Sequence, residues 1–355
     1  MIHPSAPVSS SDVRLAVTMG DACGVGPEII ARWWASESRP HAVVVGDPAV
    51  LARALQWVSA TGVTVRLVED IEEAWRLPAG VMPVWQPAGL PADLLAAPVG
   101  RVDVRAGMAA AACIRQAVRL AQQEAVDAIV TAPLHKEALA LAGEPYPGHT
   151  ELLQAEGAPP GQPPAPVRMM LANDQLKTVL VTIHVGLRQA IEQVTLPAVL
   201  GTLRITHAAA ALWGMPAPRI AVAGLNPHAG EGGLFGDEEV TIIGPAIEAA
   251  RAEGIDARGP YAPDTVFMRA RHAPPAHPGE FDVVVAMYHD QGLIPVKYLG
   301  LDQGVNVTLG LPFVRTSPDH GTAFDLAGTG RADPASFAHA VAMARQMVRG
   351  RLAAR

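Results

Sequence analysis

The chain has few cysteines and no cluster of basic residues, which argues against a disulfide-rich protein and against a nucleic-acid-binding protein. Cys23 and Cys113 are the only cysteines among 355 residues, too few for a disulfide framework or a zinc knuckle. The net charge is −7 and no dense lysine or arginine run occurs, so we expect no nucleic-acid partner. A small anionic ligand remains compatible with this charge, because local basic residues can override the global sign.

Long apolar runs are also missing. No stretch is long enough to span a bilayer, and residues 1–14 lack the apolar core of a signal peptide. We therefore expect a cytoplasmic protein without membrane contact. A composition of 50% hydrophobic and 17% charged residues is typical of a globular protein with a large core. The length favours two domains, with a single α/β barrel as the alternative.

Short apolar runs alternate with longer helical patterns. The runs expected to be strands are 14–19, 41–46, 127–133, 177–185, 219–224 and 281–290. The helical patterns cover residues 26–35, 48–58, 107–126, 196–214 and 238–254. Because the apolar runs are nearly continuous, the strands should be covered on both faces. The alternation predicts an α/β fold with a wound, largely parallel sheet.

Three histidines follow three of these strands. His184 ends "TVLVTIH", His228 follows "IAVAGLNPH" and His289 ends "VVVAMYH". In open α/β sheets, ligands bind beyond the carboxyl ends of the strands, so these side chains can converge. Three imidazoles with an open position form a catalytic divalent-metal site. The alternative for each one is a hydrogen-bonded loop residue.

Possible anion binders accompany these histidines. "PGHTE" places His149 and Thr150 at the start of an expected helix, where backbone N–H groups attract phosphate or carboxylate. The alternative for Thr150 is an ordinary helix cap. Lys297, Asn306 and Arg315 follow His289 in the sequence. Beside a metal, the positive charges of Lys297 and Arg315 suit a phosphorylated or carboxylated substrate. The alternative for each of these two residues is an ordinary surface charge.

Two glycine-rich segments lie at opposite ends of the chain. "GDACGVGPE" (20–28) follows a strand and opens a helix, but its glycines do not match the Rossmann fingerprint. "HGTAFDLAGTGRADP" (320–334) is the second segment, and a simple connecting loop is its alternative interpretation.

Seven motifs together resemble one enzyme family. They are "TMGDACGVGPEI", "TAPLHKEAL", "PGHTE", "LNPHAGEGGLFGDEE", "GPYAPDTVF", "YHDQGLIPVK" and "SPDHGTAFDLAGTG". From about Leu15 to the last helix, the chain resembles the 4-hydroxythreonine-4-phosphate dehydrogenases of vitamin B6 biosynthesis. Segments 20–28 and 320–334 also resemble the isocitrate and isopropylmalate dehydrogenases, which share the wider fold. The first loop departs from the family's usual GDPAG or GEPAG, since Ala22 stands where proline is expected.

The resemblance implies a two-domain α/β fold like that of the isocitrate and isopropylmalate dehydrogenases, with an active site in the interdomain cleft. We expect the first, nucleotide-side domain at residues 1–135 plus 290–355. The second, carrying the metal and the dimer contact, is expected at 136–289. A homodimer that completes each active site is also implied.

The resemblance further assigns roles to single residues. His184, His228 and His289 match the family's ligands to one divalent metal; three imidazoles suit zinc, with cobalt, nickel, manganese or magnesium as alternatives. The residues that match substrate contacts are His149, Thr150, Lys297, Asn306 and Arg315. The residues expected near NAD, with NADP as the alternative, are His320, Gly321, Thr322, Asp325 and Gly328.

The implied reaction is oxidation of 4-phosphohydroxy-L-threonine by NAD, followed by loss of carbon dioxide to give 3-amino-2-oxopropyl phosphate. Asp264 and Lys297 are candidate proton acceptors, and Asp264 can instead be a helix cap. A sister subgroup that oxidises 4-phospho-D-threonate or 4-phospho-D-erythronate resembles the chain as well. A metal-dependent hydrolase and a non-catalytic anion-binding protein are the remaining alternatives.

Overall fold

The chain folds into two compact units. The computed structural model describes residues 13–38, 40–159, 161–300 and 302–353. The first unit contains the described residues up to Ala165 together with Leu311–Arg349, and the second contains Pro166–Gly310 with the end of the chain from Gly350. The expected boundaries, after residues 135 and 289, lie earlier in the chain than the observed ones.

The first unit is built on a parallel sheet. Its strands are β1 (Leu15–Thr18), β2 (Ala42–Val45), β3 (Thr64–Leu67), β4 (Val81–Trp85), β5 (Ala128–Thr131) and β14 (Val314–Pro318). Within this unit they run in the order β3-β4-β2-β1-β5-β14, and each neighbouring pair is parallel. Every residue of β1, β2 and β5 is buried, as their continuous apolar sequences predict.

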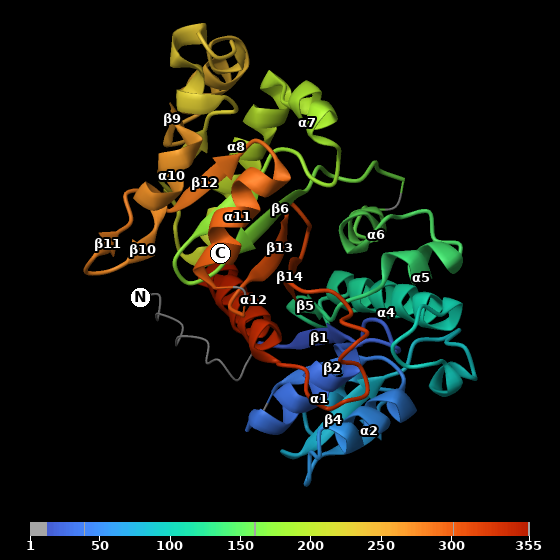
Figure 1. Ribbon diagram of the computed structural model, residues 1–355. Coiled ribbons are helices and arrows are strands. Elements are labelled where there is room, and N and C mark those ends of the chain that lie inside the picture. The colour runs from blue at the N-terminus through green and yellow to red at the C-terminus, as the bar shows by residue number, and fades with distance from the viewer. Residues whose placement is uncertain (1–12, 39, 160, 301, 354–355) are drawn as a thin grey trace, which may run out of the picture. The chain divides into compact units, whose positions relative to one another are not determined.

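Helices cover this sheet (Figure 1). They are α1 (Gly26–Ser36), α2 (Pro48–Trp57), α3 (Ile71–Ala74), α4 (Val104–Gln122), α5 (Lys136–Leu141), α6 (His149–Glu156) and most of α12 (Ala335–Ala353). The expected helix at 107–126 begins earlier, at Val104, because the Asp103 side chain accepts a hydrogen bond from the backbone N–H of Arg105 and caps it.

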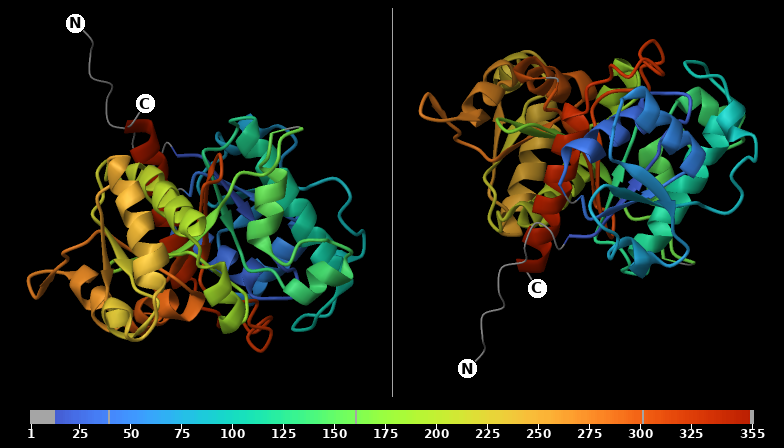
Figure 2. Two further views of the ribbon diagram at one scale, coloured as in Figure 1. Left: turned by 90° about the horizontal axis from the view of Figure 1, so that it is seen from above. Right: turned by 90° about the horizontal axis from the view of Figure 1, so that it is seen from below.

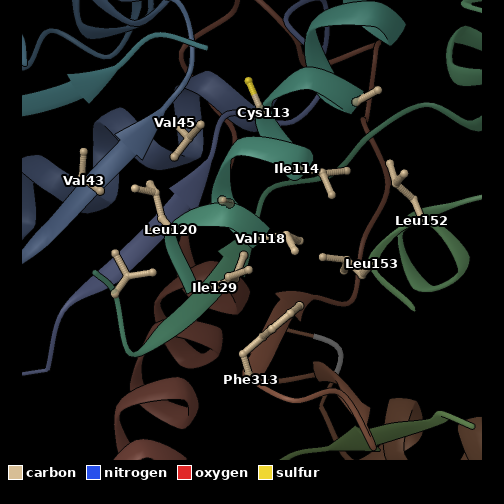
Figure 3. Packing of buried hydrophobic residues seen from close by; sticks show 14 of the residues in the cluster. Val43, Val45, Cys113, Ile114, Val118, Leu120, Ile129, Leu152, Leu153 and Phe313 are labelled. Atoms are coloured by element: carbon tan, nitrogen blue, oxygen red, sulfur yellow. The ribbon is translucent and has the colours of Figure 1, made fainter. Parts of the chain in front are cut away.

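The core of the first unit explains why its boundary falls late. Figure 3 shows Ile114 and Val118 of α4 packed with Leu153 of α6 and Phe313, all of which are buried. Since α6 contributes Leu152 and Leu153 to this core, residues 136–165 belong to the first unit rather than the second.

The second unit combines parallel and antiparallel strands. Its strands are β6 (Arg168–Ala172), β7 (Lys177–Leu180), β8 (Ile220–Ala223), β9 (Ala257–Tyr261), β12 (Val283–Ala286) and β13 (Val305–Leu309), with a separate hairpin of β10 (His272–Ala273) and β11 (His277–Pro278). The order is β13-β6-β7-β12-β8-β9, parallel from β7 to β9 and antiparallel at β6. The largely parallel sheet is confirmed.

The antiparallel pair β6–β7 was not predicted. The Asn173 side chain accepts hydrogen bonds from the N–H groups of Gln175 and Leu176, which folds the chain into a tight turn between the two strands. A crossover helix is therefore missing at this point, and the second strand runs back beside the first.

Helices lie between the strands of the second unit along the chain. They are α7 (Leu187–Gln193), α8 (Leu196–Ala210), α9 (Gly244–Ala252), α10 (Pro263–Ala270) and α11 (His289–Leu299). Leu293 and Val296 of α11 are buried in the core of this unit, which is why residues 290–310 belong here. The β10–β11 hairpin projects from the unit in each view (Figure 1 and Figure 2). Across the described ranges, no helix is both long and apolar enough to cross a bilayer.

The loop after β1 is buried and is held by hydrogen bonds within the loop, although Ala22 stands where the family that the sequence resembles has proline. Asp21 is fully buried; its carboxylate accepts from the N–H of Cys23 at 2.8 Å, and its backbone carbonyl accepts from Gly24 at 3.1 Å. Gly20 has φ +73°, and a β-carbon there would lie 2.4 Å from the carbonyl oxygen of Pro133. These contacts fix the loop without help from a proline ring.

Burial raises the pKa of Asp21 from 3.8 to about 6, and the negative charge of Asp103 adds to this, while the Cys23 N–H and His135 oppose it. Between these pH values the folded chain retains a proton that the unfolded chain has released. The contribution of Asp21 to the free energy of unfolding therefore decreases as the pH rises from about 4 to about 6.

We expect Asp21→Asn to remove this contribution and to raise the free energy of unfolding at pH 7, relative to wild type, by on the order of 3 kcal/mol. Asparagine keeps the oxygen that accepts from Cys23 and carries no charge. Urea denaturation at pH 4 and pH 7 measures the difference. Asp93→Asn, at a side chain 68% exposed, is the control and should behave like wild type. An equal pH dependence in both variants would contradict the assignment.

Candidate functional site

Three neighbouring parallel strands end beside the three predicted metal ligands. β12 pairs in parallel with β7 on one side and with β8 on the other. His184 follows β7, His228 follows β8, and His289 begins α11 directly after β12. The carboxyl ends of parallel strands meet at one edge of a sheet, so the three histidines belong to the same edge of the second unit.

His184 and His289 are in contact. Their ring centroids lie 5.6 Å apart. The Nδ1 of His289 lies 2.6 Å from the Oδ1 of Asp290, and a carboxylate accepts from Nδ1–H. This bond fixes the tautomer and leaves the Nε2 lone pair of His289 for a ligand, the arrangement common for metal-binding histidines.

His228 lies on a backbone turn of the left-handed type. It has φ +52°, and Ala229 and Glu231 share this conformation. Each non-glycine residue held this way costs roughly 1–2 kcal/mol. Such strain tends to occur at functional positions.

The three imidazoles are suitable ligands for a divalent cation, and each is exposed or half-exposed at this edge of the sheet. Over the described ranges, however, no three His, Cys, Asp or Glu side chains form a group already arranged to hold a metal ion. The structure brings His184 and His289 together and places His228 on the adjoining strand end.

Gln291 links two of these strand ends. Its Oε1 accepts from the N–H of Met287 at 2.7 Å, and its Nε2 donates to the carbonyl of Gly224 at 2.8 Å. Met287 precedes His289, and Gly224 precedes His228. One amide side chain thus ties the loop after β12 to the loop after β8.

A pocket of about 680 Å³ opens beside His228. Asp264 and Asp290 line it together with the apolar side chains of Phe267, Met268 and Ile294. Asp264 lies in the first turn of α10, a helix that begins without a side-chain cap, so the alternative role of Asp264 as a cap is wrong. The structure therefore brings the candidate proton acceptor Asp264 together with His228.

Lys297 and Asn306 lie elsewhere in the second unit. Lys297 is in the last turn of α11, about two turns beyond His289 on the same helix. Asn306 pairs with Leu171 in the β13–β6 ladder, and its Oδ1 is buried with no hydrogen-bond partner in the described structure. A buried oxygen of this kind is available to a ligand.

In the first unit the structure brings His149 and Arg315 together. Arg315 of β14 is buried and donates from Nη2 to the Oγ1 of Thr131 at 2.6 Å. Burial lowers the pKa of Arg315 to about 9, opposed by the charge of Glu151, so the guanidinium stays cationic at neutral pH. Burial, and next the charge of Arg315, hold the pKa of His149 well below 6.5.

His149 is consequently a neutral imidazole, and its buried Nε2 has no partner among the described atoms. α6 starts after Gly148 with no side-chain cap, so the alternative that Thr150 caps this helix is wrong. A buried cation, a neutral imidazole and a free helix N-terminus can together hold an anion.

The glycine-rich segment 320–334 is attached to α1. The fully buried carboxylate of Glu28 accepts from the N–H of Gly328 and from the N–H of Gly330, the second at 2.8 Å. The carbonyl of Thr322 accepts from Val25 at 2.9 Å. The two glycine-rich segments of the sequence therefore form one structure in the first unit, and this segment is more than a simple connecting loop.

The predicted cofactor residues occupy different environments. Gly321 and Asp325 are exposed, and the Nε2 of His320 is buried without a partner in the described part of the chain. Thr322 is buried against Gly24, and the N–H of Gly328 is already bound to Glu28. Thr322 and Gly328 thus hold the loop in place.

Sequence reasoning missed four residues that support these loops: Glu28, Asp21, Gln291 and Glu239. Each is a polar side chain that bonds to the backbone of a loop: Asp21 bonds within its own loop, and Glu28, Gln291 and Glu239 bond to a neighbouring one. Glu28 gave the only signal that could have been used, since a carboxylate on the apolar side of a helix requires a partner.

Comparisons with known proteins identify the family. The sequence model described as "Pyridoxal phosphate biosynthetic protein PdxA" matches residues 38–344. A 4-hydroxythreonine-4-phosphate dehydrogenase of Beijerinckia indica is 55% identical over 92% of each chain. A D-threonate 4-phosphate dehydrogenase of Salmonella typhimurium is 45% identical over 94% of this chain and 98% of its own.

Among solved structures, the 4-hydroxythreonine-4-phosphate dehydrogenase of Klebsiella pneumoniae matches with a TM-score of 0.84 and 44% identity, over 95% of this chain and 98% of its own. These three relatives are named dehydrogenases, which confirms the expected enzyme class and disfavours the hydrolase and the non-catalytic binding protein. The predicted fold is confirmed as well. With this coverage and identity, the chain belongs to the PdxA family of pyridoxal phosphate biosynthetic proteins.

Proposed function

We propose that this chain oxidises 4-phosphohydroxy-L-threonine with NAD and a divalent metal, and that decarboxylation then gives 3-amino-2-oxopropyl phosphate. The observation that carries the proposal is the row of neighbouring parallel strands β7, β12 and β8, each followed by a histidine. The name of the 55% identical relative supports the choice of substrate.

His184, His228 and His289 would hold the metal. When bound, a divalent cation lowers the pKa of a coordinated hydroxyl and stabilises negative charge on oxygen, and NAD accepts hydride. Zinc suits three imidazoles, with cobalt, nickel, manganese or magnesium as alternatives. Asp290 orients His289, and Gln291 fixes the spacing of two of the loops.

The remaining candidate residues would bind, orient or accept a proton. Arg315, His149 and Thr150 would bind the phosphate, because a cation that is already desolvated loses little on binding a dianion. Lys297 and Asn306 would contact the polar groups of the substrate. The carboxylate of Asp264 would take the hydroxyl proton, directly or through water, with the Lys297 amine as the alternative acceptor.

The NAD-binding residues would be His320, Gly321, Thr322, Asp325 and Gly328. The exposed carboxylate of Asp325 would accept hydrogen bonds from the hydroxyl groups of a ribose, and its negative charge would repel a phosphorylated ribose. The proposal therefore favours NAD over NADP. Thr322 and Gly328 would contribute by shaping the loop. Two buried free thiols, Cys23 and Cys113, accord with a reducing cytoplasm.

A second substrate has specific support. The Salmonella typhimurium relative is named for D-threonate 4-phosphate and is 45% identical. This compound class is phosphorylated at the same end and differs by a hydroxyl in place of the amine. The same phosphate and metal residues would serve it.

The substrate prediction is tested by following NADH at 340 nm. We expect turnover of 4-phosphohydroxy-L-threonine that a chelator stops and added zinc or manganese restores. 4-Phospho-D-threonate and 4-phospho-D-erythronate are run in parallel, each with NAD and with NADP. Turnover of the sugar acids alone would move the assignment to the second substrate, and reduction of neither nucleotide with any of the three would overturn both.

We expect His228→Ala to lower turnover at least about 100-fold, the upper end of what changes to groups around a metal cost. The reason is the loss of one of three imidazole ligands. His272→Ala, at an exposed histidine of the β10–β11 hairpin, is the matched control. Equal activity of the two variants, with unchanged circular dichroism, would rule out His228 as a ligand.

A homodimer that completes each active site belongs to the proposal. Three apolar side chains that line the His228 pocket are exposed: Tyr298 by 90%, Met268 by 65% and Ile294 by 64%. Phe235, whose ring contacts His228, is exposed by 50%, and its neighbour Leu234 by 72%. Water contact with this many large apolar groups is unfavourable, and a second copy of the chain would remove it.

Sedimentation equilibrium should therefore give twice the 37.1 kDa of one chain. Met268→Glu, which places a charge on this apolar surface, should shift the equilibrium toward the monomer. Leu141→Glu, at a side chain 59% exposed on α5, is the control and should leave the mass unchanged. A wild-type mass of one chain would refute the dimer.

A further inference from the structure

The segment that carries His228 is an unusual piece of backbone. Five successive residues, 228–232, have positive φ values between 45° and 77°. Three of them, His228, Ala229 and Glu231, are not glycines, and L-residues disfavour this region because the β-carbon approaches the following carbonyl oxygen. A turn of this kind persists only where its surroundings hold it.

The group that holds this turn is the buried carboxylate of Glu239. Its side chain is 4% exposed. The Oε1 accepts from the N–H groups of Leu225 at 2.7 Å and Asn226 at 2.8 Å, and the Oε2 accepts from the Asn226 side-chain amide at 3.0 Å. Both oxygens are thus committed to the residues that lead into the turn.

Close packing adds to these hydrogen bonds. A β-carbon at Gly230 would lie 2.7 Å from the Oε2 of Glu239, and one at Gly224 would lie 2.9 Å from its Oε1. The carboxylate therefore fills the space beneath the turn on both sides. Gly224 and Gly230 are the residue types that allow this approach.

Glu239 is itself placed by a distortion of its helix. Residues Glu239–Ile243 form a single π-type turn immediately before α9, in the yellow coil near β9 in Figure 1. π-Turns are uncommon and occur frequently at functional sites. The preceding Glu238 accepts from the Asn226 side-chain amide at 2.6 Å, which adds a second acidic contact to the same amide.

We propose that Glu239 is a positioning residue for His228: its buried carboxylate holds the left-handed turn and so presents the imidazole at the sheet edge. The proposal rests on the proposed function, in which His228 binds a divalent cation. Without the carboxylate, the N–H groups of Leu225 and Asn226 lose their acceptor and the turn relaxes toward right-handed backbone. His228 then leaves the edge that it shares with His184 and His289.

The test uses metal-free protein with no substrate or nucleotide. Zinc binding is measured by calorimetry for wild type, Glu239→Gln, Glu239→Ala and His228→Ala. Amide hydrogen exchange of residues 225–236 and the thermal unfolding midpoint are measured on the same samples. Glu248→Gln is the matched control, since Glu248 is an exposed glutamate on α9 that pairs with Arg251.

We expect zinc affinity to fall about 10- to 100-fold in Glu239→Gln, the range found when groups behind a metal ligand are changed. Exchange at 225–236 should accelerate, and Glu248→Gln should match wild type in both readouts. Should Glu239→Ala fail to fold, Glu239→Gln, which keeps the shape of the side chain, carries the test. A lower unfolding midpoint with unchanged zinc affinity would show a merely structural role and would overturn the proposal.

Failure of the proposed function has a separate signature. If wild type binds none of zinc, cobalt, nickel, manganese and magnesium, or if His228→Ala binds the metal as tightly as wild type, His228 is not a ligand and the role of Glu239 falls with it. If His228→Ala loses binding while both Glu239 variants keep wild-type affinity, only the positioning role of Glu239 is overturned.

Discussion

The parallel pairing of β7, β12 and β8 is the constraint on which the site depends. Hydrogen bonds between parallel strands make the chain leave all three at the same edge of the sheet. β8 and β12 are buried and apolar throughout, and β7 ends in the buried Val179 and Leu180, so the polar groups of the site lie in the loops that follow the strands. His184, His228 and His289 are far apart in sequence and reach one edge for this reason alone.

Buried carboxylates fix loops in each of the two units. Glu28 holds the segment around Gly328, Glu239 holds the turn of His228, and Asp21 holds the loop after β1. Each accepts hydrogen bonds from backbone N–H groups that would otherwise be buried without a partner. Burying a carboxylate is unfavourable, and the raised pKa of Asp21 shows that its bonds offset this only in part.

The two units contribute different chemistry to the proposed reaction. The second unit has imidazoles and a carboxylate beside an apolar pocket, which suits a metal and a proton acceptor. The first has Arg315 beside a neutral His149, which suits phosphate. The two candidate substrates share the phosphate and the oxidised hydroxyl, so these residues are compatible with both, and the amine or hydroxyl next to the carboxylate is where they differ.

The sequence by itself determined the fold class, the positions of β1, β2, β5, β7, β8 and β12 along the chain, and the residue types of the site; β3, β4, β6, β9, β13 and β14 were not predicted. Continuous apolar runs, and histidines directly after them, are local patterns, and the family motifs are contiguous. Tertiary structure alone decided which strands are neighbours, that β6 turns back antiparallel at Asn173, and that the first unit extends to Ala165. It alone also revealed Glu28, Gln291 and Glu239, because each acts on backbone groups of a separate loop, and hydrogen bonds to backbone leave no mark in the sequence of the accepting loop.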